Sequence, residues 1–126
     1  MNKWVLDSSA VLAVIFGENG HEIAKARFSD ASISSVNVAE VLSTLADRGR
    51  VTEDDITDFS ELRLRVVDFD FDQATKVAEL RPLTRHLGLS LGDRSCLALA
   101  MQEKATAVTA DRAWKGLSVC AIEVIR

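Results

Sequence analysis

The order of hydrophobic and polar positions along the chain predicts short strands that alternate with helices. Five apolar runs are short enough to be buried strands, and they cover residues 3–6, 31–35, 65–71, 106–110 and 121–125. Segments with apolar residues at helical spacing lie between them, at residues 9–16, 36–49, 72–88 and 91–105. This alternation favours a mainly parallel sheet with helices covering both faces, which makes the fold α/β.

Glycines and capping residues refine these boundaries. Gly17 and Gly20 separate the first helix from a second one that runs through Phe28. Thr52 and Asp55 resemble a capping box, which predicts a further helix in the acidic segment "TEDDITDFSE".

Length and composition indicate one soluble, intracellular domain. A chain of 126 residues should bury roughly two-thirds of its unfolded surface, so we expect a single domain over residues 1–126. Cys96 and Cys120 lie in apolar segments and are expected to be core residues in a reducing cytoplasm. Because no apolar stretch reaches the ~18 residues of a membrane span and the N-terminus lacks a signal-peptide layout, we expect no membrane association.

Charge is the composition feature that bears most on partners. The formal net charge of −4 argues against a broadly cationic, nucleic-acid-binding face. However, the basic residues gather in short groups, namely "RGR", "RLR", "RPLTRH" and "DRAWK". These groups could form a locally basic rim on an acidic protein, or they could be ordinary solvated faces.

Four acids lie where the predicted strands end or where the following helices begin. Asp7 comes directly after the first strand, and Asp111 comes directly after the strand "TAVTA". Glu40 and Asp93 lie in the first turns of helices. In parallel sheets, ligands bind outside the carboxyl ends of the strands, where these helices also start. We therefore expect the four acids to converge on one cleft.

Each acid also has an ordinary explanation. Asp7, Asp93 and Asp111 could each cap a helix or turn, or complement a helix dipole. Glu40 fits that explanation least well, because it lies inside an apolar segment with helical period. A shared site explains all four acids at once.

A divalent cation would allow such acids to lie together. Clustered carboxylates repel one another unless a positive charge compensates them. Mg²⁺, or Mn²⁺ as a substitute, prefers oxygen ligands, polarises phosphoryl groups and activates water, which indicates phosphodiester hydrolysis. Neighbouring polar side chains could orient the acids, or could serve only turns and caps: Ser8, Ser9, Asn37 and Thr109.

The segments that carry these acids resemble the PIN-domain ribonucleases, and more narrowly the VapC toxins of bacterial VapBC toxin-antitoxin modules. The segments are "VLDSSAVLAVIFGE", "SSVNVAEVL", "LSLGDRSCLALA" and "AVTADRAW". The similarity covers nearly the whole chain, and its most specific part is the order and spacing of the acids. By this resemblance Asp7, Glu40, Asp93 and Asp111 form the catalytic and metal-binding quartet, in which Asp7 and Asp93 match the most consistent Mg²⁺ ligands.

The resemblance carries further expectations about fold, activity and partners. It implies a PIN-like three-layer α/β/α sandwich and a Mg²⁺-dependent endoribonuclease that cleaves structured RNA, such as tRNA or rRNA, and so inhibits translation and growth. It also implies a homodimer in a larger complex with a VapB-like antitoxin, whose C-terminal segment occupies the active-site groove. The alternatives are a PIN-domain nuclease for RNA processing and a noncatalytic RNA-binding relative, which would be marked by loss of acids.

The chain departs from the family pattern at two places. Asn37 stands where a hydroxyl residue is common, so the polar surroundings of the acids are expected to differ. Ala113 and Trp114 stand where some relatives have a further acid, so a fifth metal-site carboxylate is doubtful.

Three residues beside the acids have two interpretations each. Arg94 follows Asp93 and Arg112 follows Asp111, so these arginines could contact substrate phosphate or could form surface ion pairs. Trp114 could stack on a base or could pack in the core.

Two other magnesium-dependent folds fit poorly. A haloacid-dehalogenase-like phosphatase would need a second Asp where this chain has Ser9, and a response-regulator receiver would need an acid next to Asp7.

Overall fold

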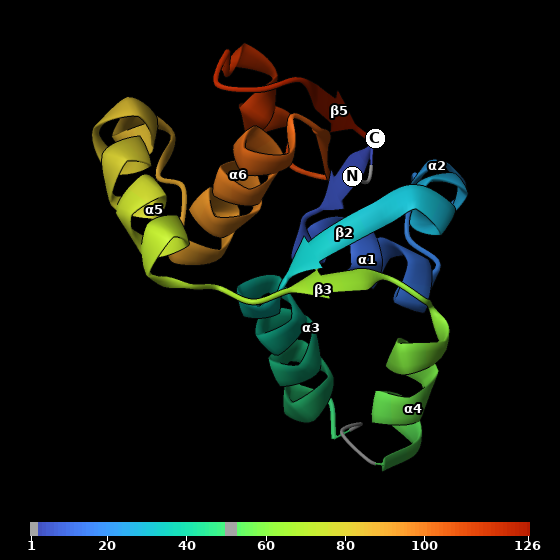
Figure 1. Cartoon of the computed structure of the whole chain (residues 1–126). Coiled ribbons are helices and arrows are strands. Elements are labelled where there is room, and N and C mark those ends of the chain that lie inside the picture. Colours follow the sequence, from blue (N-terminus) through green and yellow to red (C-terminus); the bar gives the residue numbers. More distant parts are fainter. Residues whose placement is uncertain (1–2, 50–52) are drawn as a thin grey trace.

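The computed structural model describes residues 3–49 and 53–126, and in this part of the chain five strands form one all-parallel sheet (Figure 1). The order across the sheet is β3-β2-β1-β4-β5, so β1 and β4 lie near its centre. The strands are β1 (Trp4–Leu6), β2 (Ala31–Ser34), β3 (Arg65–Val67), β4 (Thr106–Thr109) and β5 (Ile122–Val124).

Helices connect each strand to the next. They are α1 (Ser8–Phe16), α2 (His21–Arg27), α3 (Ser35–Asp47), α4 (Glu53–Glu61), α5 (Phe71–Thr84) and α6 (Leu91–Glu103). Short 3-10 helices add η1 (Phe28–Asp30), η2 (Arg85–Leu87) and η3 (Arg112–Gly116). Within the described residues, no helix combines the length and the apolar character needed to cross a membrane.

The core forms two apolar layers, one on each face of the sheet. Successive residues of a strand point to opposite faces. Val5 and Ala107 belong to the layer made with α5 and α6, whereas Leu6 and Val108 belong to the layer made with α1, α2 and α3. Figure 1 shows α5 and α6 on one side of the sheet and α1 and α2 on the other. The predicted three-layer α/β/α fold with a parallel sheet is therefore confirmed.

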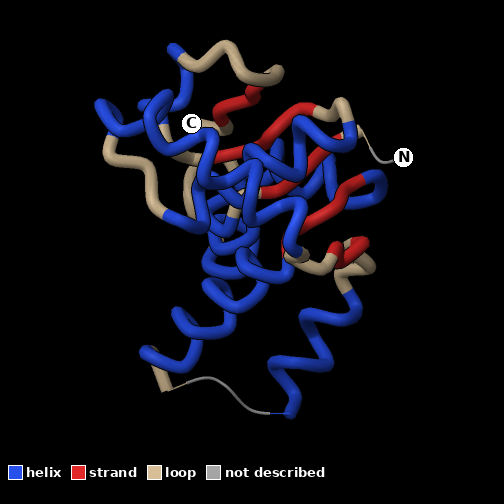
Figure 2. The backbone as a smooth tube through the Cα atoms, turned by 60° about the vertical axis from the view of Figure 1, so that its left-hand side comes forward, coloured by secondary structure: helices blue, strands red, loops and turns tan. Residues whose placement is uncertain are grey.

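Helices α3 and α4 project beyond the sheet in the same direction (Figure 2). Both helices pack against the core, because Val41 and Leu45 of α3 and Phe59 of α4 belong to the apolar layer that contains α1. The site described below lies at the opposite, amino-terminal end of α3, where this helix leaves β2.

The third strand is shorter than the sequence predicted, because Asp70 begins a helix. β3 ends at Val67, whereas the alternating pattern predicted a strand through residue 71. The Asp70 carboxylate accepts a hydrogen bond from the Gln73 backbone N–H at 2.9 Å and thereby caps α5. Phe71 is consequently the first residue of α5, with 84% of its surface exposed.

The other predicted boundaries differ by small amounts. The helix predicted to run through Phe28 ends as α2 at Arg27 and continues as a 3-10 turn. Pro82 lies inside α5, as the sequence indicated. α4 begins at Glu53, while Thr52 of the predicted capping box lies outside the described residues.

The Asp70 cap can be tested by substitution. Asp70→Ala removes the acceptor for the first turn of α5, so we expect it to lower the free energy of unfolding by about 1 kcal/mol. Urea denaturation measures this loss. Asp68→Ala is the matched control, because Asp68 is exposed two residues earlier and makes no hydrogen bond with the described residues. Equal losses for the two variants would contradict the cap.

Candidate active site

The parallel register of β1 and β4 brings Asp7 and Thr109 to the same edge of the sheet. Leu6 lies beside Val108, and the Asp7 backbone N–H donates to the Val108 carbonyl oxygen at 2.9 Å. Asp7 therefore follows β1 at the point where Thr109 ends β4. This is the edge at which the sequence placed the four acids.

Two hydroxyls hold the carboxylate of Asp7. Its Oδ2 accepts hydrogen bonds from Ser9 Oγ at 2.7 Å and from Thr109 Oγ1 at 2.9 Å. Only 4% of the Asp7 surface is exposed. Asp7 occupies the N-cap position of α1, but its side chain makes no capping hydrogen bond, so the interpretation of Asp7 as a helix cap is wrong.

The same hydroxyls also accept hydrogen bonds from the chain that leaves β4. Ser9 Oγ accepts from the Ala110 backbone N–H at 2.9 Å, and Thr109 Oγ1 accepts from the Asp111 backbone N–H at 3.1 Å. Each hydroxyl thus donates to the carboxylate and accepts from the β4 exit. Asp7 is fixed against the segment that leads to Asp111.

Burial makes Asp7 a weaker acid than an ordinary aspartate. It raises the pKa of Asp7 to about 7, and the nearby charges of Asp93 and Glu40 act in the same direction, while the hydrogen bonds from Ser9 and Thr109 oppose them. A carboxylate with this pKa is half-protonated near neutral pH. A cation at this position would favour the ionised form.

Asp93 and Asp111 both cap helical turns, as the sequence allowed. Asp93 forms a capping box with Ser90, in which Asp93 Oδ2 accepts from the Ser90 N–H at 2.9 Å. Asp111 Oδ1 accepts from the Ala113 N–H at 2.9 Å. Each cap occupies one carboxylate oxygen and leaves the other without a hydrogen bond among the described residues. Partial burial raises the pKa of Asp93, and the neighbouring Glu40 and Asp111 charges add to this increase.

Glu40 is held by polar side chains from α1 and α3. Its Oε1 accepts a hydrogen bond from Asn37 Nδ2 at 2.9 Å, and Ser8 Oγ also donates to this atom. Asn37 is fully buried, and its Nδ2 further contacts Ser8 Oγ at 3.1 Å. The polar residues that the sequence associated with the acids therefore contact them: Ser8 and Asn37 contact Glu40, and Ser9 and Thr109 contact Asp7.

The four acids are neighbours, and they range from buried to exposed. Asp7 feels the charges of Asp93 and Glu40, and Asp93 feels those of Glu40 and Asp111. Across residues 3–49 and 53–126, however, no three Asp, Glu, His or Cys side chains meet as a ready-made metal-binding group. Mg²⁺ is commonly bound through one or two carboxylates, with water and phosphate oxygens as its other ligands. The carboxylate oxygens of these acids fit such an ion, as does the burial of Asp7 without a basic partner among the described residues.

The three residues beside the acids have different environments. Trp114 is fully buried in the layer with α5 and α6, so it packs in the core and the base-stacking interpretation is wrong. Arg94 donates to the Val77 carbonyl oxygen of α5 at 3.1 Å, which ties α6 to α5. Arg112 is exposed beside Asp111, and its Nε donates to the Arg126 carbonyl oxygen at 3.0 Å.

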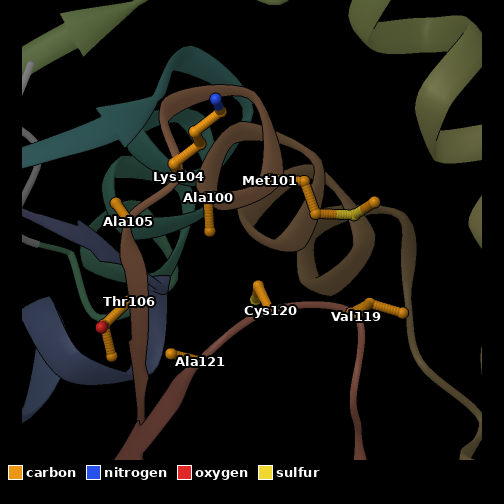
Figure 3. A pocket seen from close by; sticks show the side chains of 8 residues that line it. All are labelled: Ala100, Met101, Lys104, Ala105, Thr106, Val119, Cys120 and Ala121. Carbon is orange, nitrogen blue, oxygen red and sulfur yellow. The ribbon is translucent and has the colours of Figure 1, made fainter.

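A separate hollow of about 380 Å³ lies at the other end of β4. Thr106 begins β4 and lines this hollow, whereas Thr109 ends β4 at the acids. Figure 3 shows Cys120 between Ala121 and Val119. Burial raises the pKa of the Cys120 thiol, so the thiol is neutral at physiological pH.

Sequence reasoning missed Gly92, which lies against Glu40. A Cβ atom built at Gly92 would overlap the Glu40 carboxylate. The only signal in the sequence is that the residue before Asp93 in "SLGDR" has no side chain.

Comparison with known proteins identifies related folds. A family model of the PIN domain matches residues 4–118. DNA-bound VapBC from Salmonella typhimurium is similar with a TM-score of 0.73 and 20% identity over 100% of both chains. A toxin-antitoxin complex from Klebsiella pneumoniae is similar with a TM-score of 0.71 and 16% identity over 97% of both chains. A VapBC-family structure from Mycobacterium tuberculosis is similar with a TM-score of 0.62 and 23% identity over 98% of both chains. A search of curated proteins finds no match.

The raised pKa of Asp7 predicts that its ionisation lowers the free energy of unfolding in a pH-dependent way. Its ordinary pKa is 3.8 and its folded value is about 7, so the stability it contributes is present below pH 3.8 and is lost as the pH rises through 7. Asp7→Asn cannot ionise. We therefore expect it to raise the unfolding free energy of metal-free protein by roughly 2–4 kcal/mol at pH 8, with a gain that shrinks towards pH 4.

Thermal or urea unfolding in EDTA at several pH values measures this gain. Asp30→Asn controls for the loss of one negative charge, since Asp30 is exposed. A gain for Asp7→Asn that is the same at pH 5 and pH 8 would contradict the buried-carboxylate interpretation.

Proposed function

Since this chain belongs to the PIN-domain family, we propose that it is a metal-dependent endoribonuclease that hydrolyses phosphodiester bonds in structured RNA. The observation that supports this most strongly is the buried carboxylate of Asp7. Its neighbours are two hydroxyls and two further acids, Asp93 and Glu40, rather than a basic side chain from the described part of the chain. Such a charge is compensated most simply by a bound cation.

We propose Mg²⁺ as this cation, with Mn²⁺ as a substitute. Asp7 and Asp93 would hold it, with Glu40 and Asp111 as further acidic neighbours that bind it directly or through water. All these donors are carboxylate oxygens, which suits a hard divalent ion. When bound, the ion supplies an activated water and polarises the phosphodiester.

The other residues of the site prepare it for the reaction. Ser9 and Thr109 both bind Oδ2 of Asp7, which fixes the carboxylate and leaves Oδ1 without a hydrogen bond from the described residues. Asn37 and Ser8 fix Glu40 in the same way. Arg112 is exposed and adjacent to Asp111, so we assign it to substrate phosphate. Arg94 is a weaker candidate, because its side chain is half-buried and its guanidinium binds α5.

We further propose that the protein is a cytoplasmic toxin of the VapC type. The similar structures named above are a toxin-antitoxin complex, a DNA-bound VapBC and a member of the VapBC family. A VapB-like antitoxin would bind this protein and block its acids, and the toxin would act as a homodimer. Cleavage of tRNA or rRNA would then arrest translation and growth. A housekeeping nuclease or a noncatalytic relative would not do so.

The nuclease proposal predicts metal-dependent RNA cleavage. Purified protein should cleave structured RNA with Mg²⁺ or Mn²⁺, and EDTA should abolish cleavage. Asp7→Asn and Asp93→Asn should each lower the cleavage rate by at least about 100-fold, because each removes a charge from the metal site. Gel analysis of labelled tRNA and rRNA measures the rates.

Asp30→Asn is the control, since Asp30 is an exposed acid that ends η1 just before β2, away from the carboxyl ends of β1 and β4. The expected stabilisation of Asp7→Asn also excludes unfolding as the reason for its inactivity. Cleavage that resists EDTA and both site substitutions would rule out the metal site.

The toxin proposal predicts a distinct result in cells. Induced expression should stop growth, co-expression of the antitoxin encoded beside the gene should restore it, and Asp7→Asn should be harmless. Sequencing of RNA 5′ ends after induction identifies the cleaved RNA. Normal growth, with specific cleavage of a precursor RNA instead, would favour a processing nuclease.

A further inference from the structure

The carboxylate of Glu40 lies directly against the backbone of Gly92, in the first turn of α6. A Cβ atom at Gly92 would lie far inside van der Waals contact with the carboxylate carbon and both carboxylate oxygens of Glu40. Gly92 is buried. The two helices α3 and α6 therefore approach closely enough at this point for a charged group of one to touch the main chain of the other.

The backbone conformation does not explain a glycine at this position. Gly92 belongs to α6 and is not among the described glycines with positive φ. Alanine is more favourable than glycine inside a helix, because glycine loses more conformational freedom on folding. The missing side chain is therefore required by what lies against it, which is Glu40.

Asn37 completes this arrangement from the other side. Its Nδ2 lies 2.9 Å from Glu40 Oε1 and 3.0 Å from the Gly92 carbonyl oxygen. One buried amide thus contacts both the carboxylate and the residue on which it rests. Its Oδ1 is buried with no hydrogen-bond partner in the described part of the chain, so the position of Asn37 is set by its Nδ2 contacts.

We propose that Gly92 is a positioning residue for Glu40: the space left by its missing side chain, closed by Asn37, sets where the Glu40 carboxylate lies beside Asp93. This inference rests on the proposed nuclease function and adds a specific role for the glycine. A Cβ at position 92 forces the carboxylate away and breaks its hydrogen bonds to Asn37 and Ser8. The fold tolerates the change, because the end of the half-buried Glu40 side chain can move.

The first test separates this role from a structural one. Gly92→Ala should lower kcat for RNA cleavage about 10- to 100-fold, the scale of a small misplacement of a reacting group, with KM for RNA nearly unchanged. Its melting temperature should stay within about 2 °C of the wild type or rise. Gly116→Ala is the matched control, because Gly116 also has no positive φ and a Cβ there meets no atom within 4 Å. Full activity of Gly92→Ala would overturn the proposal.

The second test does not use activity. Gly92→Ala is made in the wild type and in Glu40→Ala, and the change in melting temperature is compared between the two backgrounds. The overlap with the carboxylate opposes the helix preference of alanine only when Glu40 is present. We therefore expect Gly92→Ala to raise the melting temperature by a few degrees more in Glu40→Ala than in the wild type.

The two tests also distinguish failure of this inference from failure of the proposed function. An identical thermal effect of Gly92→Ala in both backgrounds means that Gly92 does not act on Glu40, and the inference fails whatever the protein catalyses. A wild-type protein that never cleaves RNA overturns the proposed function, while the thermal comparison still decides whether Gly92 positions Glu40.

Discussion

The pairing of β1 with β4 is the constraint on which the rest of the site depends. This pairing buries Asp7 beside Thr109, and a buried carboxylate needs hydrogen bonds or a positive charge. Because α1 starts immediately after Asp7, the hydroxyl of Ser9 lies in its first turn and reaches back to the carboxylate. Ser8, one residue earlier, reaches Glu40 instead. The pairing of β1 with β4 thus places the hydroxyls that contact Asp7, and the turn that follows β1 places the one that contacts Glu40.

The acids differ in how strongly the protein constrains them. Asp7 is buried, Glu40 and Asp93 are half-buried, and Asp111 is exposed. Desolvation raises the pKa of both Asp7 and Asp93, while Asp93 and Asp111 each use one oxygen to cap a helical turn. Capping and metal binding are therefore compatible uses of the same carboxylate, since each cap leaves one oxygen without a hydrogen bond from the described residues. The local and the functional explanations of these residues need not exclude each other.

The sequence predicted the architecture well, because strand and helix periods are local properties. It also predicted the common edge of the acids, since topology alone sends parallel strand ends to one side. It misplaced the end of β3, because the alternation in "DFDF" imitates a strand while Asp70 caps a helix. It could not predict that Gly92 supports Glu40, because 52 positions separate them (92 minus 40) and only the packing of α3 on α6 brings them together. Contacts between side chains of distant elements have no periodic signal.

The hydrogen bond between Thr109 and Asp7 joins residues 102 positions apart, and this separation has a consequence for biosynthesis. The ribosome makes Asp7 early and its partner on β4 much later, and pairing over such a distance has a loop-closure cost that only the complete sheet offsets. The emerging chain therefore carries its acids dispersed. The four acids come together only after β4 has left the ribosome and inserted beside β1, and before that point the chain has no assembled acidic centre.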